Sequence, residues 1–413
     1  MSALLAALRT RVQRVVNATP VLDIHTHLYD PHFGSLLLWG IDELLVYHYL
    51  VSESFRHFEI PYETFFRATK SEQAERIWQA LFVEHSPVSE ACRGVITTLN
   101  ALGLSPRRHD LAALRRWFSA QAPQQQVDRV LQLANVEGIG MTNSPFDLEE
   151  RAYWDQALTR DERFFAALRL DVLLVGWKSA VPILQCWGYR VTPELNQRTA
   201  DGVRRFLADW TRRLGARYCM VSLPPTFTFP AQTETAWLIE HAVLPHCREF
   251  GQPLALMMGV KRQVNPALGL AGDGLGRSDL VALENLCAGF AENRFAVTVL
   301  AREAQHELVV LARKFRNLHP FGCWWFTNTP QLVREITSMR LELLGTSFTP
   351  QHSDARVLDQ LVYKWKHSRK VIADCLTERY SDLAASGWMV TDVELERDGR
   401  ELLGGAFARF CKW

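Results

Sequence analysis

Short apolar runs alternate with longer segments of helical spacing along most of the chain. The first run covers residues 21–28 and contains two histidines, His25 and His27. Seven further runs are each followed by polar or aromatic residues: 138–143, 164–170, 218–222, 254–259, 295–300, 323–326 and 346–348. Strands that alternate with helices form βαβ units with right-handed crossovers, so the pattern predicts a parallel sheet.

Eight such units are what a (β/α)8 barrel requires, and the reactive residues of these barrels gather at the C-terminal ends of the strands. A doubly wound open sheet is the alternative. No G-x-G-x-x-G follows the first strand, where a dinucleotide-binding sheet would carry it. We therefore predict an α/β fold with a distorted TIM barrel.

The apolar spacing stays helical between the first two predicted strands. We interpret this stretch, residues 40–132, as a helical insertion after the first strand. Residues 1–39 would then form an N-terminal helix and the first strand. Residues 133–413 would form the rest of the barrel with C-terminal helices.

His25 and His27 are two positions apart, so in a strand both imidazoles point to the same face. The missing part of a metal site is expected at the end of another strand, and the last predicted strand is followed by Asp354. First and last strands are neighbours in a closed barrel. Two imidazoles and one carboxylate suit a divalent ion such as Zn²⁺ or Mn²⁺ and leave positions for water or substrate.

Asp354 and Arg356 could also have simpler roles that involve neither a metal ion nor a substrate. Ser353-Asp354 is also well suited to cap the N-terminus of a helix. Arg356 could be an ordinary surface cation. Beside a sugar acid it could instead hold a carboxylate with two parallel hydrogen bonds, which lysine cannot do.

Composition gives no sign of a charged macromolecular partner. The chain has 413 residues, 46 of them basic and 45 acidic, so we expect no binding to nucleic acid or to an anionic membrane. No apolar stretch approaches the length of a membrane span, and the N-terminus does not have the pattern of a signal peptide. Eight cysteines without a C-x-x-C pair indicate reduced thiols in a cytoplasmic protein.

Four segments in order carry a more specific resemblance. They are His25-Thr26-His27, the stretch 300–308, the aromatic stretch 321–326 and the stretch 351–356. Together they resemble the uronate isomerases (glucuronate isomerases) of the amidohydrolase superfamily, from about residue 20 to the C-terminus. The resemblance implies a barrel of the amidohydrolase type and a metal-assisted conversion of D-glucuronate to D-fructuronate and of D-galacturonate to D-tagaturonate.

The resemblance also implies roles for individual residues. His25, His27 and Asp354 match the metal ligands of the family. The positions that match its substrate pocket are His48, Tyr49, Arg169, Trp325 and Arg356. Arg169 could instead form only a salt bridge with Asp171 or Asp147. Many amidohydrolases carry a histidine on strand five, but this strand reads Leu-Ala-Leu-Met-Met-Gly, which argues for a single metal ion.

An aldose–ketose isomerisation moves a proton from C2 to C1 through a cis-enediol. We expect Tyr49 and Asp354 to share the proton transfers, with Arg356 beside the enediolate and lowering the pKa of Tyr49. His48 is an alternative base. Two other functions compete with isomerisation: hydrolysis of a small amide, ester or lactone by one metal-bound hydroxide, and a non-catalytic barrel that binds sugar acids. Apolar residues in the insertion and the Trp-rich segments favour a homo-oligomer.

Overall fold

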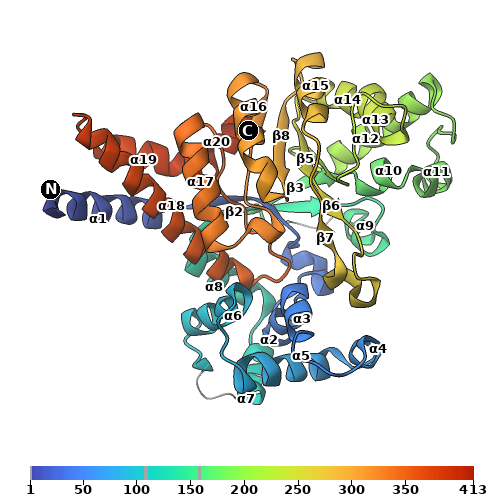
Figure 1. The fold of residues 1–413 in the computed structure, drawn as a ribbon. Helices are drawn as coiled ribbons and strands as arrows, with labels where there is room; N and C mark the ends of the chain where they lie inside the picture. The colour runs from blue at the N-terminus through green and yellow to red at the C-terminus, as the bar shows by residue number, and fades with distance from the viewer. Residues whose placement is uncertain (1, 107–109, 157–159) are drawn as a thin grey trace.

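The computed structural model describes residues 2–106, 110–156 and 160–413 of the chain. Its centre is a sheet of parallel strands in the order β1-β2-β3-β4-β5-β8-β9 (Figure 1). These strands are β1 (Val21–Thr26), β2 (Val136–Asn143), β3 (Phe164–Arg169), β4 (Cys219–Leu223), β5 (Leu254–Met258), β8 (Phe295–Val299) and β9 (Leu318–Pro320). Neighbouring strands follow one another along the chain, with helices in each crossover, as the alternating pattern predicts.

An irregular segment, residues 349–355, lies between the last strand and the first, and we call it the closing segment. Phe321 forms a parallel bridge with Thr349, and the Gly322 N–H donates to the Thr349 carbonyl at 2.8 Å. Further along, the Asp354 N–H donates to the His25 carbonyl at 3.2 Å. The curled sheet is thereby completed by backbone hydrogen bonds, and the predicted α/β fold with a distorted (β/α)8 barrel is confirmed.

The last two predicted strands are wrong. The seventh strand is Leu318–Pro320, ahead of the predicted run, and Trp325–Thr327 forms a short 3-10 helix, η7. Pro320 lacks an N–H and is unusual in a strand, so it hides this strand from the sequence pattern. Trp324 and Trp325, in the predicted run, are buried without belonging to a strand. Residues 346–348 form turns and bends, and only Thr349 makes a bridge.

The strands are buried on both faces because helices cover the outside of the sheet. Every residue of β5 is buried, as is typical of parallel sheets. The covering helices include α9 (Leu148–Trp154), α10 (Asp171–Val175), α11 (Trp177–Cys186), α12 (Gln197–Leu214), α13 (Glu234–Leu238), α14 (Leu244–Glu249), α15 (Val281–Gly289), α16 (Gln305–Lys314) and α17 (Pro330–Leu344). The C-terminal region adds α18 (Gln360–Ala385), α19 (Asp392–Arg400) and α20 (Ala406–Cys411). The N-terminal α1 (Ser2–Ala18) lies along α18 (Figure 1).

Helix α12 illustrates how the local sequence sets these elements. The Asn196 side chain accepts a hydrogen bond from the Thr199 N–H and caps the first turn. Val203, Phe206 and Trp210 are buried at helical spacing and face the sheet. Gly215 ends the helix in the left-handed conformation with φ +61°, which glycine adopts without steric cost.

Most of the helices between β1 and β2 have a hydrophobic core of their own. They are α2 (Ile41–Leu45), α3 (His48–Ser54), α4 (Tyr62–Phe66), α5 (Lys70–Trp78), the π-helical turn η2 (Gln79–Glu84), α6 (Glu90–Ala101) and α7 (Leu111–Ser119). Figure 1 shows α2 to α7 gathered on one side of the sheet. Leu45, Phe65 and Ile77 are at the centre of this core. The buried side chains of the following helix, α8 (Pro123–Ala134), belong instead to the core of the barrel. The domain limits at residues 40 and 132 stay a prediction.

None of the helices in the described ranges combines the length and the apolar character that a membrane crossing requires.

Asp23, in the middle of β1, ties three parts of the fold together. Its buried carboxylate accepts hydrogen bonds from the Ser353 N–H at 3.1 Å and from the Trp365 indole N–H at 2.8 Å. The first donor lies in the closing segment and the second in α18. Removing this acceptor would leave two buried donors without a partner, which is costly inside a protein.

We predict that Asp23→Asn lowers the free energy of unfolding by about 1–3 kcal/mol, because an amide offers only one acceptor atom to two buried donors. Chemical denaturation followed by circular dichroism measures the change. Trp365→Phe should cost part of the same free energy, and the double variant should be less destabilised than the sum of the two. The surface variant Asp201→Asn is the control, and a wild-type denaturation curve for Asp23→Asn would contradict the prediction.

Candidate metal centre and active site

Three side chains with metal-binding atoms meet at the C-terminal end of β1. His25 and His27 come from this strand and the residue just beyond it, and Asp354 comes from the closing segment. The Asp354 Oδ1 lies 3.5 Å from the His25 Nε2 and 3.4 Å from the His27 Nε2. All three ligand atoms lie within 4.8 Å of one another. The period-two spacing of the histidines thus brings both imidazoles to one point.

The donor set fits a divalent cation. Asp354 Oδ1 is buried, and no donor of the described residues makes a hydrogen bond to it. Burial alone would raise the pKa of Asp354, but His25 and His27 hold it well below its usual 3.8, so the carboxylate is ionised. Burial and the charge of Arg356 lower the pKa of His27 to about 3, so this ring is neutral. Neutral imidazole and ionised carboxylate are the forms that bind metal.

Thr142, at the end of β2, sets the tautomer of His27. Its hydroxyl donates to the Thr26 carbonyl at 2.9 Å and lies 3.1 Å from the His27 Nδ1. A hydroxyl has one proton to donate, so the Nδ1–H of His27 must be the donor in the second contact. The lone pair of Nε2 then faces Asp354. Such an outer hydrogen bond is typical of metal-binding histidines.

The backbone at Asp354 is in the left-handed region, with φ +53°. This conformation is uncommon outside glycine, and Asp tolerates it better than most residues. The alternative that Asp354 caps a helix is wrong, because α18 begins at Gln360 and Asp359 is its N-cap. The turn instead directs the Asp354 carboxylate toward the two histidines.

A cavity lies beside these three residues, with about 370 Å³ of atom-free space when its opening to solvent is included. Its lining combines the candidate metal ligands with cations, aromatic rings and methionines. The lining residues are His25, His27, His48, Arg169, Met220, Ser222, Met257, Arg262, Trp324, Trp325, Asp354 and Arg356. Three guanidinium groups face one carboxylate, so the lining carries a net positive charge and suits an anionic ligand.

Comparisons with known proteins agree with this geometry. No protein-family model matches the chain, and a search of curated proteins found no match. Among solved structures, the uronate isomerase from Bacillus halodurans is 50% identical, with a TM-score of 0.97, over 99% of this chain and 97% of that one. The chain belongs to the uronate isomerase family.

Two more distant structures share the fold. The uronate isomerase from Thermotoga maritima is 16% identical over 98% of this chain and 97% of its own, with a TM-score of 0.77. The glucuronate isomerase from Caulobacter crescentus is 14% identical over 99% of this chain and 94% of its own, also with a TM-score of 0.77. At such low sequence identity, the similarity shows only that these proteins share a fold.

The two arginines predicted for this uronate isomerase family member both reach the cavity. Arg169 ends β3 and donates to Asp171 at 3.0 Å, so the expected salt bridge exists together with a position in the lining. Arg356 follows the closing segment and is partly buried in the cavity wall. The alternative that Arg356 is an ordinary surface cation is therefore wrong.

The aromatic residues predicted for the site form one side of it. Trp325 is buried, with φ +47°, and its ring lies 5.6 Å from the ring of His48. Its indole nitrogen has no hydrogen-bond partner among the described residues. A buried donor in the wall of a polar cavity is available to a ligand.

Tyr49 lies behind His48, at a ring distance of 4.6 Å, and the residues that line the cavity do not include it. Burial, with Tyr47 and Asp354 nearby, raises the pKa of Tyr49 well above 10. The predicted lowering of this pKa by Arg356 is wrong, because desolvation dominates. The catalytic role of Tyr49 stays a prediction.

Sequence analysis missed several residues of the site. Met257, on β5, lines the cavity together with Met220 of β4. Both methionines are at strand positions expected to face the barrel interior, so the sequence pattern could have indicated that they line the site. Thr142 and Arg262 offered none, because their roles depend on contacts with residues far away in the chain.

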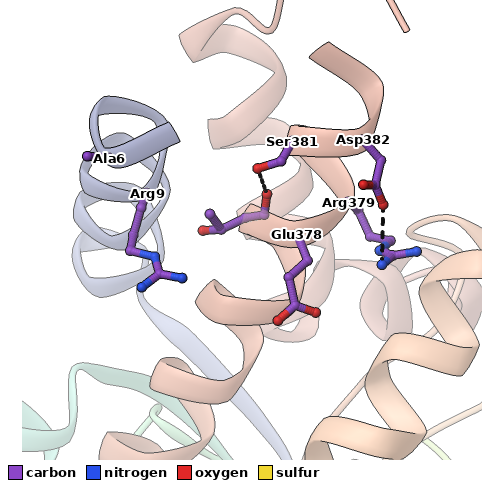
Figure 2. A pocket seen from close by; sticks show the side chains of 7 residues that line it. Ala6, Arg9, Glu378, Arg379, Ser381 and Asp382 are labelled. Carbon is purple, nitrogen blue, oxygen red and sulfur yellow. Dashed lines mark hydrogen bonds and ion pairs between the residues drawn. The ribbon is translucent and has the colours of Figure 1, made fainter. Parts of the chain in front are cut away.

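Another hollow lies between α1 and α18 (Figure 2). Three of its charged residues form ion pairs at the surface: Arg379 lies 3.3 Å from Asp382, and Glu378 accepts from Arg334 at 2.8 Å. It is built by helices and not by strand ends. We therefore do not include it in the candidate site.

We predict that Thr142→Val weakens binding of a divalent ion by about 10- to 100-fold, because the variant no longer orients the His27 ring. Competition with a fluorescent chelator for Zn²⁺ measures the affinity. Thr142→Ser keeps the hydroxyl and should bind like the wild type. An affinity of the Val variant equal to that of the wild type would rule out this role.

Proposed function

We propose that the protein is a uronate isomerase, which converts D-glucuronate to D-fructuronate and D-galacturonate to D-tagaturonate. The observation that carries this proposal is the 50% identity to the Bacillus halodurans uronate isomerase over nearly the whole of both chains. The cavity supports it independently, because Arg169, Arg262 and Arg356 line it and give it the charge that a sugar acid requires.

We propose one divalent ion, Zn²⁺ by preference and Mn²⁺ as the alternative, held by His25, His27 and Asp354. The compact set of two imidazoles and one carboxylate supports this number and type of ligand. When bound, the ion would polarise oxygen atoms of the substrate. Met257 on β5 stands where a second ion would need a histidine, which supports a single ion.

The arginines and aromatic residues of the cavity wall bind the substrate. Arg169 and Arg356 can each donate parallel hydrogen bonds to a carboxylate or to neighbouring hydroxyl oxygens. Asp171 holds the Arg169 guanidinium in place. Trp325 provides an apolar wall and a free indole N–H. Burial and the charge of Arg356 lower the pKa of His48 to about 3, so its neutral imidazole can form a hydrogen bond with a hydroxyl group of the substrate.

The proton transfers need a base near C2 and a donor near C1. Asp354 suits the base, because its carboxylate is ionised and buried. Tyr49 suits the donor, because its raised pKa keeps the phenol protonated, and His48 is an alternative. The base removes the C2 proton, the electrons of that C–H bond form a C1–C2 double bond, and the carbonyl electrons move onto the C1 oxygen to give the cis-enediolate. The proton of the C2 hydroxyl then passes to the C1 oxygen. The electrons left on the C2 oxygen form the C2 carbonyl while C1 takes a proton from the donor, which the protonated base replenishes. Arg356 stabilises the negative charge that develops on the oxygens.

We further propose a homo-oligomer that works in the cytoplasm. The exposed side chains of Tyr62, Phe66, Val264 and Leu270 support an interface between copies of the chain. All eight cysteines are free, which supports a reducing compartment.

We predict that the purified protein converts D-glucuronate or D-galacturonate to a ketose and loses this activity when a chelator removes the metal. Circular dichroism, or coupled reduction by mannonate or altronate dehydrogenase, measures the ketose, and Zn²⁺ or Mn²⁺ should restore activity. His25→Ala should contain less than one metal per chain, whereas His306→Ala, on the exposed face of α16, should match the wild type. Hydrolysis of a lactone without turnover of any uronate would refute the proposal.

We predict that Arg356→Lys lowers kcat/KM by about 10- to 150-fold, the equivalent of one hydrogen bond to a charged group of about 1.5–3 kcal/mol. Lysine keeps the charge but loses the fork of parallel N–H groups. Steady-state kinetics with D-glucuronate measure the effect. Equal kcat/KM for the two proteins would show that charge alone matters at this position.

A further inference from the structure

Between β5 and β8 the chain makes an excursion that contains a short antiparallel pair of strands. Gly259, with φ +107°, turns the chain out of β5, and a Cβ at this position would lie 2.8 Å from the Gly276 carbonyl oxygen. Beyond the turn, β6 (Val260–Lys261) pairs antiparallel with β7 (Gly274–Leu275), and the 3-10 segment η5 (Pro266–Gly272) connects them. The excursion therefore starts at the C-terminal end of a barrel strand, where barrel enzymes bind their substrates.

Arg262 is held rigidly at the base of this excursion. Its Nη1 donates to the Asp273 Oδ2 at 2.6 Å, and the Gln263 N–H donates to the other oxygen at 2.8 Å. The Asp273 side chain is only 4% exposed, so the carboxylate that holds this half-exposed guanidinium group is itself fixed within the protein. Gln263 adopts φ +49°, which is uncommon for this residue type and indicates that the turn is fixed by its contacts.

The guanidinium group of Arg262 belongs to the wall of the active-site cavity. It shares this wall with Arg169, Arg356 and the candidate metal ligands, although it comes from outside the barrel. Its side chain is 49% exposed, which places it at the rim. Among the described residues, Asp273 supplies the one acceptor that meets this guanidinium, so further N–H groups are free for a ligand.

The outer part of the excursion covers the approach to the cavity. Asn265 donates to the Tyr62 hydroxyl of α4 at 3.4 Å, which joins the excursion to the helices of the insertion. Residues 268–271 form one wall of a second, mostly apolar hollow, and His48 and Arg356 line both this hollow and the cavity. Figure 1 shows β6 and β7 between the sheet and the insertion. A ligand that reaches the cavity thus meets the excursion at its rim.

We propose that Arg262 binds the uronate substrate and that Asp273 is its positioning residue. This inference rests on the proposed function and deepens it, since it names a substrate contact outside the barrel strands. The ion pair with one carboxylate already restricts the arginine side chain, so little conformational freedom remains to be lost when a ligand binds. The remaining N–H groups can therefore bind sugar oxygens with little further ordering. Because Arg262 lies at the rim of the cavity, we expect its replacement to weaken substrate binding more than it slows the proton transfers.

The test compares Arg262→Ala with Lys261→Ala, a variant of the neighbouring exposed residue that does not line the cavity. Two measurements are made on the metal-loaded protein. The first is KM and kcat for D-glucuronate. The second is calorimetric binding of L-gulonate, the sugar acid in which the aldehyde of D-glucuronate is replaced by a primary alcohol and which therefore cannot isomerise.

For Arg262→Ala we expect KM for D-glucuronate and Kd for L-gulonate each to rise by about 10-fold or more, with kcat changed by less than about 3-fold. Lys261→Ala should match the wild type. Arg262→Lys should fall between the wild type and the Ala variant. Asp273→Asn should show a smaller rise in both constants than Arg262→Ala, with an unchanged circular dichroism spectrum to show that it folds.

Two failures can be told apart. If the wild type binds L-gulonate but turns over no uronate, the proposed isomerase function is wrong, and the Kd of Arg262→Ala still decides the role of Arg262. If the wild type isomerises D-glucuronate and Arg262→Ala has the same KM and Kd, the role of Arg262 is wrong and the isomerase function stands. Absence of L-gulonate binding by the wild type, or an equal loss in Lys261→Ala, also overturns the assignment.

Discussion

The junction between β1 and the closing segment is the constraint on which the rest of the structure depends. Backbone hydrogen bonds join His25 to Asp354 and His27 to Ala355, and the buried Asp23 carboxylate holds Ser353 and Trp365. Without this junction the curled sheet would be open between its first and last strands. The same contacts bring a carboxylate from the C-terminal part of the chain against two imidazoles from its beginning. Closure of the barrel and assembly of the metal centre are therefore one event.

Ion pairs and burial set the charge of each side chain that lines the cavity. The guanidinium groups of Arg169 and Arg262 are each held by a carboxylate outside the cavity, at Asp171 and Asp273. These outer partners reduce the mutual repulsion of the cations without removing the net positive charge of the lining. The neutral His27 and His48 and the ionised Asp354 also line the cavity. Each state follows from burial together with the nearest charge.

Much of the fold could be predicted because local periodicity reflects burial. The first six predicted strands and the helical character of the stretch after the first strand follow from apolar spacing, and the bounds of these six strands differ from the predicted ones by only a few residues. The last two strands could not be predicted. Pro320 is the last residue of the true seventh strand, which is only three residues long, and the eighth position of the barrel is filled by irregular backbone whose hydrogen bonds go to β1 and β9. No local pattern encodes such a segment.

The sequence by itself determined the spacing of His25 and His27, the alternation that makes a barrel, and the family to which the chain belongs. These features depend on residues close together in the chain or on whole motifs. Only the tertiary structure decided that Thr142 orients His27, that Tyr49 is desolvated, and that Arg262 enters the cavity from an excursion held by Asp273. Each of these depends on distances between side chains that are remote in sequence, and such distances exist only once the barrel has closed.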